Sequence, residues 1–69
     1  MKIDLHCNIE NIEVYTGKNG FGANVTVSQL NNKKRNLLVF NTSNAEIANI
    51  LENHLQEEVD LELELVQNN

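Results

Sequence analysis

Hydrophobic and polar residues alternate along most of this chain, and a two-residue period is typical of half-buried β-strands. The first alternating segment runs from residue 3 to residue 14. Its hydrophobic residues are odd-numbered up to Ile9 and even-numbered from Ile12 onward, so one extra residue lies near Glu10-Asn11. A β-bulge at that point would let both sets face one core, and we therefore expect a long, sharply bent first strand.

A glycine-containing turn separates this strand from a second alternating segment, residues 21–28. Asn19-Gly20 is a strong hairpin signal, because both residues tolerate the positive φ that the two central positions of a type I′ turn require. The pattern predicts that the two strands pair antiparallel.

The next segment is polar and basic over residues 31–36, and we expect it to form a loop. It leads into Leu37–Phe40, four consecutive apolar residues. This run is too short for a helix and predicts a third strand that is covered on both faces.

A helical period follows this third strand. Ser43-Asn44-Ala45-Glu46 matches a capping box, in which the serine hydroxyl accepts a hydrogen bond from the Glu46 amide and the Glu46 carboxylate reaches back. Apolar residues then recur at helical spacing as far as Leu55, which predicts an amphipathic helix of about three turns lying on the sheet.

The final alternating segment, residues 59–65, has the strictest two-residue period in the chain. Its polar positions are all acidic, and outward-facing carboxylates would discourage edge-to-edge pairing of a small open sheet. We expect the residues after Val66 to be frayed. The chain is thus predicted to be mainly β with one helix, in the order β-β-β-α-β.

Length and composition add the following limits. The 69 residues form one predicted domain, residues 1–69, with a small core that favours association into a homodimer. The single cysteine, Cys7, allows no intramolecular disulfide. No apolar run approaches the roughly 20 residues of a membrane-spanning helix, and the N-terminus has no signal-peptide pattern, so we expect a cytoplasmic protein with no membrane contact.

The net charge of −5 is divided unevenly along the chain. Residues 1–44 contain all five Lys and Arg side chains and have a net charge of +2. Residues 45–69 contain seven Asp and Glu side chains, no Lys or Arg, and a net charge of −7. Such asymmetry predicts two faces of different electrostatic character, although a solvated acidic surface that maintains solubility is an equally simple explanation.

The order of elements, with a bent first strand and a glycine-containing first hairpin, resembles a reduced OB-fold. The chain is most similar to compact single-stranded-DNA-binding or accessory proteins of phages and mobile elements. Only one strand follows the helix, whereas a full OB barrel has two. The resemblance therefore implies a small, open OB-like barrel whose gap a second copy fills.

The same resemblance implies a binding face on the second and third strands and their flanking loops. Single-stranded nucleic acid is bound by cations that contact phosphates and by rings on which bases stack. The nucleic-acid-binding candidates are Tyr15, Lys18, Phe21, Lys33, Lys34 and Arg35. The simpler alternatives are core packing for Phe21 and Phe40, and a solvated loop for the three consecutive cations. Binding of single-stranded nucleic acid by a non-catalytic protein is our first functional hypothesis.

The acidic C-terminal half supports a second hypothesis, a protein-interaction module such as a phage or mobile-element inhibitor or adaptor. In this interpretation the acidic strand docks on a basic surface of a partner protein, acting as a mimic of DNA. The partner-binding candidates are Glu57, Glu58, Asp60, Glu62 and Glu64.

Other chemistry finds little support in the sequence. His6, His54 and Cys7 have none of the spacings typical of metal sites, so we expect no metal and no cofactor. Cys7 shares the apolar register of the first strand, which predicts a buried, inert thiol. The acidic residues have no apolar pocket that would raise a pKa, and an enzyme is not expected.

Overall fold

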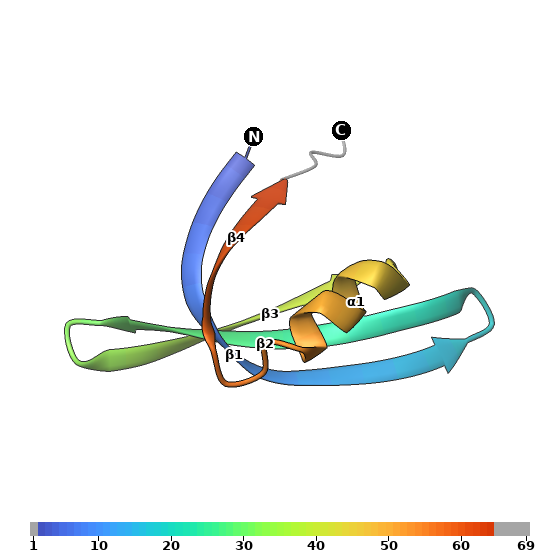
Figure 1. Cartoon of the computed structure of the whole chain (residues 1–69), viewed down its shortest axis with the longest axis horizontal. Coiled ribbons are helices and arrows are strands. Elements are labelled where there is room, and N and C mark those ends of the chain that lie inside the picture. Colours follow the sequence, from blue (N-terminus) through green and yellow to red (C-terminus); the bar gives the residue numbers. More distant parts are fainter. Residues whose placement is uncertain (1, 65–69) are drawn as a thin grey trace.

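The computed structural model describes residues 2–64 and contains four strands and one helix (Figure 1). The elements are β1 (Lys2–Gly17), β2 (Gly20–Asn31), β3 (Lys34–Thr42), α1 (Ala45–Glu52) and β4 (Glu58–Glu64). The predicted mainly-β class, the single helix and the order β-β-β-α-β are confirmed. The predicted end of the last strand at Leu65 and the frayed residues after Val66 lie outside the described residues.

The four strands form one antiparallel sheet in the order β3-β2-β1-β4, and the sheet does not close on itself. The long β1 is shared: Lys2–Asn8 pair with β4, whereas Asn8–Gly17 pair with β2. The register shifts between Ile9 and Asn11, which confirms the predicted bulge. At this point β1 bends, so that its first half rises with β4 from the long β1–β2–β3 layer (Figure 1). We call this two-stranded part, Lys2–Asn8 with Glu58–Glu64, the arm.

The core lies on the inner side of this bend, where α1 packs over β1 and β2. Ile9, Val25 and Val27 are completely buried, and Cys7 and Leu51 complete the cluster. Because β1 switches parity at the bulge, side chains from both of its halves reach this core.

The second apolar set of β1 is covered only in part. Ile12 packs against the core, but Val14 is half-exposed, because it lies farther along the β1–β2 hairpin. The expectation that both sets face one core is thus wrong for Val14.

The prediction for the third strand is wrong with respect to burial. Leu37, Leu38 and Val39 are 66%, 46% and 59% exposed, and only Phe40 packs against the core. The run is not covered on both faces because, among the described residues, α1 is the one element outside the sheet that contacts β3, and it lies near Phe40 at the end of the strand.

The two hairpin turns also differ from expectation. The first turn has Lys18-Asn19 at its centre, Gly17 pairs with Gly20, and positive φ is found at Gly20 (101°) rather than at Asn19. This fits a turn followed by one left-handed residue. The turn with two positive φ values is Asn32 (50°) and Lys33 (67°), as a type I′ hairpin requires. Residues 31–36 are thus not a loop, since β2 and β3 continue up to this two-residue turn.

The helix begins one residue later than the capping-box pattern suggests. Asn44, not Ser43, is the N-cap, and its Oδ1 accepts hydrogen bonds from the backbone amides of Glu46 (2.9 Å) and Ile47 (3.3 Å). The helix has eight residues rather than about three turns.

A turn after α1 leads the chain back to the bulge of β1. Gln56 has φ 65°, and its backbone amide donates to the Ile9 carbonyl (2.7 Å). The Ile9 amide in turn donates to the Glu57 carbonyl (3.1 Å). Among residues 2–64, no helix has the length and apolar composition needed to cross a membrane.

Candidate functional site

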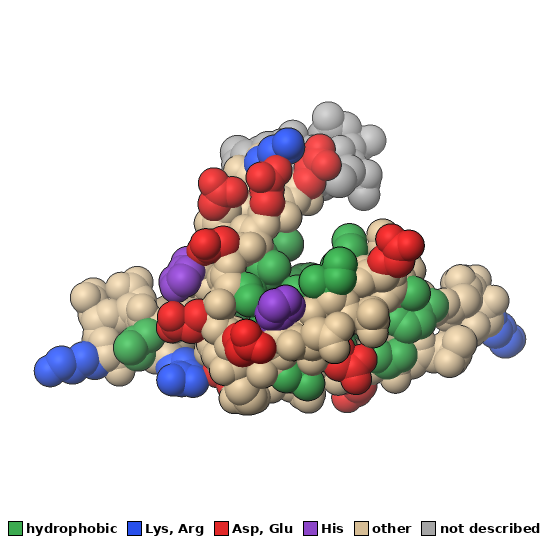
Figure 2. All heavy atoms as spheres, in the orientation of Figure 1, with side chains coloured by type: hydrophobic (Ala, Val, Ile, Leu, Met, Phe, Trp, Pro, Cys, Tyr) green, Lys and Arg blue, Asp and Glu red, His purple; other side chains and the backbone are tan. Residues whose placement is uncertain are grey.

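The six predicted nucleic-acid-binding residues do not form one surface. Lys18 lies in the β1–β2 turn, whereas Lys33 and Lys34 lie at the β2–β3 turn. These turns are separated by the full length of β2, which is roughly 35 Å for twelve extended residues. The two hairpins point in opposite directions in Figure 1, and Lys and Arg groups lie at both ends of the long axis in Figure 2.

The two candidate rings point to opposite faces of the β1–β2 hairpin. Tyr15 pairs with Gly22 and Phe21 pairs with Thr16, and successive cross-strand pairs face opposite sides of a sheet. Tyr15 is exposed and its hydroxyl oxygen accepts a hydrogen bond from Asn41 Nδ2 (2.6 Å), whereas Phe21 is half-buried. The rings therefore do not make a common platform for bases.

Arg35 is engaged with an acidic partner. Its Nη1 lies 2.8 Å from Glu10 Oε1, and the buried Ser28 hydroxyl donates to the same oxygen. Hydrogen bonds from Ser28 first, then from Asn8 and Arg35, hold the pKa of the Glu10 carboxyl below its usual value. The charge of Arg35 is thus balanced at the bulge of β1.

The predicted acidic residues of β4, in contrast, form a row on one face of the arm. Asp60 pairs with His6 and Glu62 with Asp4, and this alternation turns the carboxylates outward, while Leu61 and its apolar neighbours face the core. Successive carboxylates on a strand are about 7 Å apart. The exposed carboxylates of this face are Asp4, Glu58, Asp60, Glu62 and Glu64. We call this set the acidic face; Figure 2 shows Asp and Glu groups following the arm.

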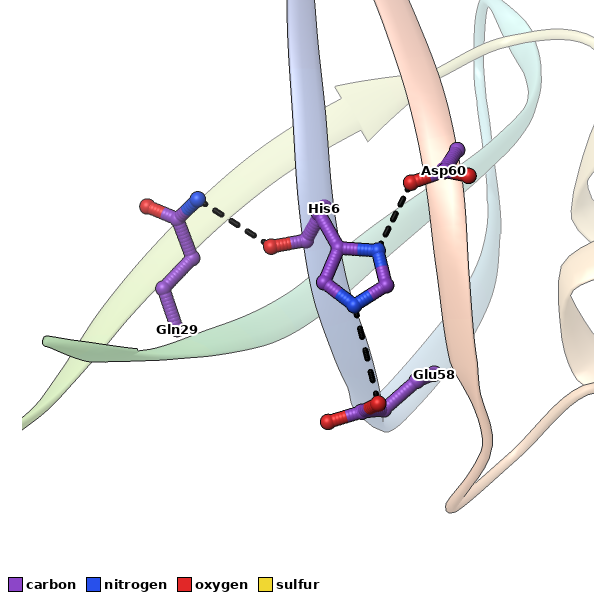
Figure 3. Close-up of polar contacts among 4 residues, drawn as sticks. All are labelled: His6, Gln29, Glu58 and Asp60. Atoms are coloured by element: carbon purple, nitrogen blue, oxygen red, sulfur yellow. Dashed lines mark hydrogen bonds and ion pairs between the residues drawn. The ribbon is translucent and has the colours of Figure 1, made fainter.

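Two cationic side chains lie within the acidic face. Lys2 Nζ is 3.2 Å from Glu62 Oε1, and His6 Nδ1 is 2.7 Å from Asp60 Oδ1 (Figure 3). His6 Nε2 is 3.5 Å from Glu58 Oε2, and the two carboxylates, Asp60 above all, raise the pKa of His6. Even with His6 protonated, the five carboxylates leave this face with a net charge of −3.

Glu57 does not belong to this row. It precedes β4, and its Oε1 lies 3.6 Å from His54 Nδ1. Asp4, in contrast, joins the acidic face although the sequence analysis did not select it. The signal was present, because Asp4 occupies a polar position of the first alternating segment, which pairs antiparallel with the acidic strand.

The remaining candidate groups are Cys7 and the possible metal ligands His6 and His54. Cys7 is buried as predicted, and burial raises the pKa of its thiol. Within residues 2–64, no group of three or more His, Cys, Asp or Glu side chains is arranged to hold a metal ion.

An apolar groove of about 200 Å³ lies where β3, α1 and β4 approach one another. The side chains that line it are Phe40, Asn41, Thr42, Ile47, Leu51, Leu61, Glu62 and Leu63. The alternation in β4 and the helical spacing in α1 indicate which of these residues share a face. Their convergence on one groove depends on the bend of β1, which no single segment reveals.

Comparison of the chain with known protein families, with curated proteins and with solved structures finds no match.

Proposed function

We propose that this protein is a non-catalytic interaction module that docks its acidic face on a basic surface of a partner protein. The observation that supports this proposal is the row of carboxylates along the arm, spaced regularly and turned away from the core. In this respect the acidic hypothesis is favoured over nucleic-acid binding, whose candidate cations are divided between the two ends of the molecule.

The physical basis is electrostatic complementarity. A surface with several uncompensated charges of one sign attracts an oppositely charged partner over distances of about 10 Å at moderate salt. The pleat of a two-stranded arm also fixes the spacing of those charges, which adds selectivity for a partner with matching cations. A regular row of negative charges is how a protein would imitate a nucleic-acid backbone.

A labelled peptide of alternating Lys and Arg residues provides a defined probe for fluorescence anisotropy. We expect the wild-type protein to bind this peptide with an affinity that falls as salt is added. The double variant Glu62→Lys/Glu64→Lys should lose most of that binding.

The matched control is the double variant Glu46→Lys/Glu52→Lys, which changes the net charge equally but at α1. We expect this control to retain most of the affinity for the peptide. An equal loss in the two double variants would contradict the proposal, because binding would then depend on net charge and not on the acidic face.

A second candidate function, binding of single-stranded nucleic acid, is supported by one local feature. Lys18 and the exposed Tyr15 belong to the β1–β2 hairpin, which corresponds to the first binding loop in the OB resemblance. Anisotropy with a labelled oligothymidine at low salt tests it. Binding that weakens in Tyr15→Ala and Lys18→Ala would support this function, and absence of binding in the micromolar range would exclude it.

A further inference from the structure

The edge strand β3 exposes an unusual combination of groups. Within residues 2–64, its backbone pairs with β2 on one side, and no other described strand pairs with its opposite side. Leu37 and Val39 are exposed on one face of the strand, and the half-exposed Leu38 lies on the other. Unpaired edges with apolar side chains readily pair with another strand, and proteins normally protect them with charges, proline or bulges.

The other edge of the sheet, β4, has such protection. Its outward side chains are carboxylates at every second position, so a β4–β4 contact between two copies would bring like charges together. In β3, the residues from Asn36 to Thr42 include neither a charge nor a proline. The β4 edge thus has charged side chains that oppose pairing with another copy, and this part of β3 has none.

We propose that β3 pairs antiparallel with β3 of a second copy across a two-fold axis near Leu38, forming one continuous eight-stranded sheet. The axis sets Leu37–Val39 against the same three residues of the partner. The outer edges of this sheet are then the two β4 strands with their acidic faces. Association closes at the dimer, because those edges repel one another.

Charge complementarity favours this antiparallel arrangement. Two cations lie at the beginning of β3, and Arg35 is already paired with Glu10, which leaves Lys34; the end of β3 leads to α1 and Glu46. Antiparallel pairing separates Lys34 of one copy from Lys34 of the other and brings it to the end of the partner strand that precedes Glu46. A parallel arrangement would place like charges side by side.

The exposed apolar side chains on the outer face of β3 continue onto the neighbouring strand. Leu37 and Val39 lie on the same face as the exposed Leu30 of β2, and contiguous exposed apolar side chains mark surfaces that contact a partner. This inference does not depend on the proposed docking function, since β3 and β4 occupy opposite edges of the sheet.

Sedimentation equilibrium over a range of concentrations tests the association directly. We expect the wild-type protein to reach twice the chain mass of 7.8 kDa at high micromolar concentration. Leu37→Lys and Val39→Lys should each weaken the dimer by up to about tenfold, since each replaces an apolar partner in two symmetry-related cross-strand pairs. Both side chains are exposed within one copy, so each variant should keep the circular dichroism spectrum of the wild type.

The control is Ile50→Lys, at a similarly exposed apolar residue that belongs to α1 and not to β3. This variant should dimerise like the wild type. A wild-type protein that stays monomeric at high micromolar concentration would overturn the proposal, as would equal dimerisation of all three variants.

Disulfide cross-linking tests the geometry. A two-fold axis brings one residue of β3 opposite its own copy, with a Cα–Cα distance of about 4.5–5.5 Å, which a disulfide can span. Among single variants Leu37→Cys, Leu38→Cys and Val39→Cys, one should therefore cross-link rapidly, whereas Ile50→Cys should not. Cys7 is buried and does not interfere. A dimer in which none of the three cross-links would contradict pairing through β3.

Discussion

At the scale of single residues, Glu10 shows how the bulge of β1 is stabilised. Its carboxylate accepts hydrogen bonds from Ser28 and Arg35 on two different strands, which lowers its pKa from the usual value of about 4.5. A carboxyl whose pKa is lower in the folded than in the unfolded state adds stability above the unfolded value. That contribution is lost as the pH falls from about 4.5 through the pKa of the folded protein.

The hydrogen bond from Ser28 is the largest contribution to this pKa shift. We therefore expect Ser28→Ala to raise the pKa of Glu10 toward its usual value, and Arg35→Gln to raise it as well, because it removes both a hydrogen bond and a positive charge. When the pH is lowered from neutral to below 4.5, both variants should lose less free energy of unfolding than the wild type, because a smaller part of their stability depends on ionised Glu10. An NMR titration of the Glu10 side-chain carbon measures the shift, and an unchanged pKa of Glu10 in Ser28→Ala would contradict the assignment.

Gly22 and Tyr15 form a second interaction that is local to one residue pair. The two are cross-strand neighbours, and a Cβ atom at Gly22 would lie only 2.6 Å from Cε2 and Oη of the Tyr15 ring. Glycine thus makes room for the ring, which would otherwise have to move away from Asn41. In the absence of this ring, alanine would be the better residue, because glycine within a strand makes the folded protein less stable than alanine does, by about 0.5–1 kcal/mol.

A double-mutant cycle tests this dependence. Gly22→Ala should destabilise the wild-type protein but stabilise the Tyr15→Ala variant, with a coupling energy of at least about 0.5 kcal/mol in urea unfolding. Additive effects of the two substitutions would mean that the ring does not need the glycine.

At the scale of elements, the start of α1 illustrates what local patterns can and cannot decide. Ser43 and Asn44 are both favoured N-cap residues, so composition alone leaves two starting points. The structure selects Asn44, whose φ of −92° and ψ of 110° are extended while its side chain reaches two helical amides.

This assignment predicts a clear difference between neighbouring substitutions. Asn44→Ala should lower the free energy of unfolding by about 1 kcal/mol, whereas Ser43→Ala should change it by only a few tenths of that value. Thermal unfolding followed by circular dichroism measures both. A larger loss of stability with Ser43→Ala would mean that Ser43, and not Asn44, is the N-cap.

The strands and the bulge could be predicted because each leaves a signal in consecutive residues. Between Ile9 and Ile12 the apolar positions change from odd to even numbers, and this change requires one extra residue in the strand whatever the strand packs against. Whether another part of the protein packs over β3 leaves no such signal in consecutive residues. Four consecutive apolar residues favour a strand with apolar surroundings, but they do not say whether those surroundings come from the same chain.

At the scale of the whole molecule, the candidate sites depend on the lengths of the strands. The row on β4 could be predicted from alternation alone, since a strand turns every second side chain to one face. The separation of Lys18 from Lys33 depends on β2 continuing unbroken for twelve residues. The alternation of apolar and polar residues ends at Ser28, and the polar, basic residues 31–36 favour a loop, so the sequence does not show how far apart the two turns lie.

The whole molecule also relies on a very small core. Ile9 is completely buried at the junction of the arm, β2 and the turn after α1. Its backbone forms hydrogen bonds with the backbones of Gln56 and Glu57. Ile50 lies on α1 and is 57% exposed. The same substitution, isoleucine to alanine, should therefore have very different effects at the two positions.

We expect Ile9→Ala to cost about 2–5 kcal/mol, because it removes buried methyl groups and leaves a cavity. A chain of this length has a total stability of roughly 3–10 kcal/mol, so this variant should lose a large fraction of it. Ile50→Ala should change the stability by less than about 0.5 kcal/mol, since the residue is mostly exposed and alanine favours helix. Urea unfolding of both variants at one protein concentration measures the difference. Similar losses at the two positions would mean that the arm and the long layer do not share the core centred on Ile9.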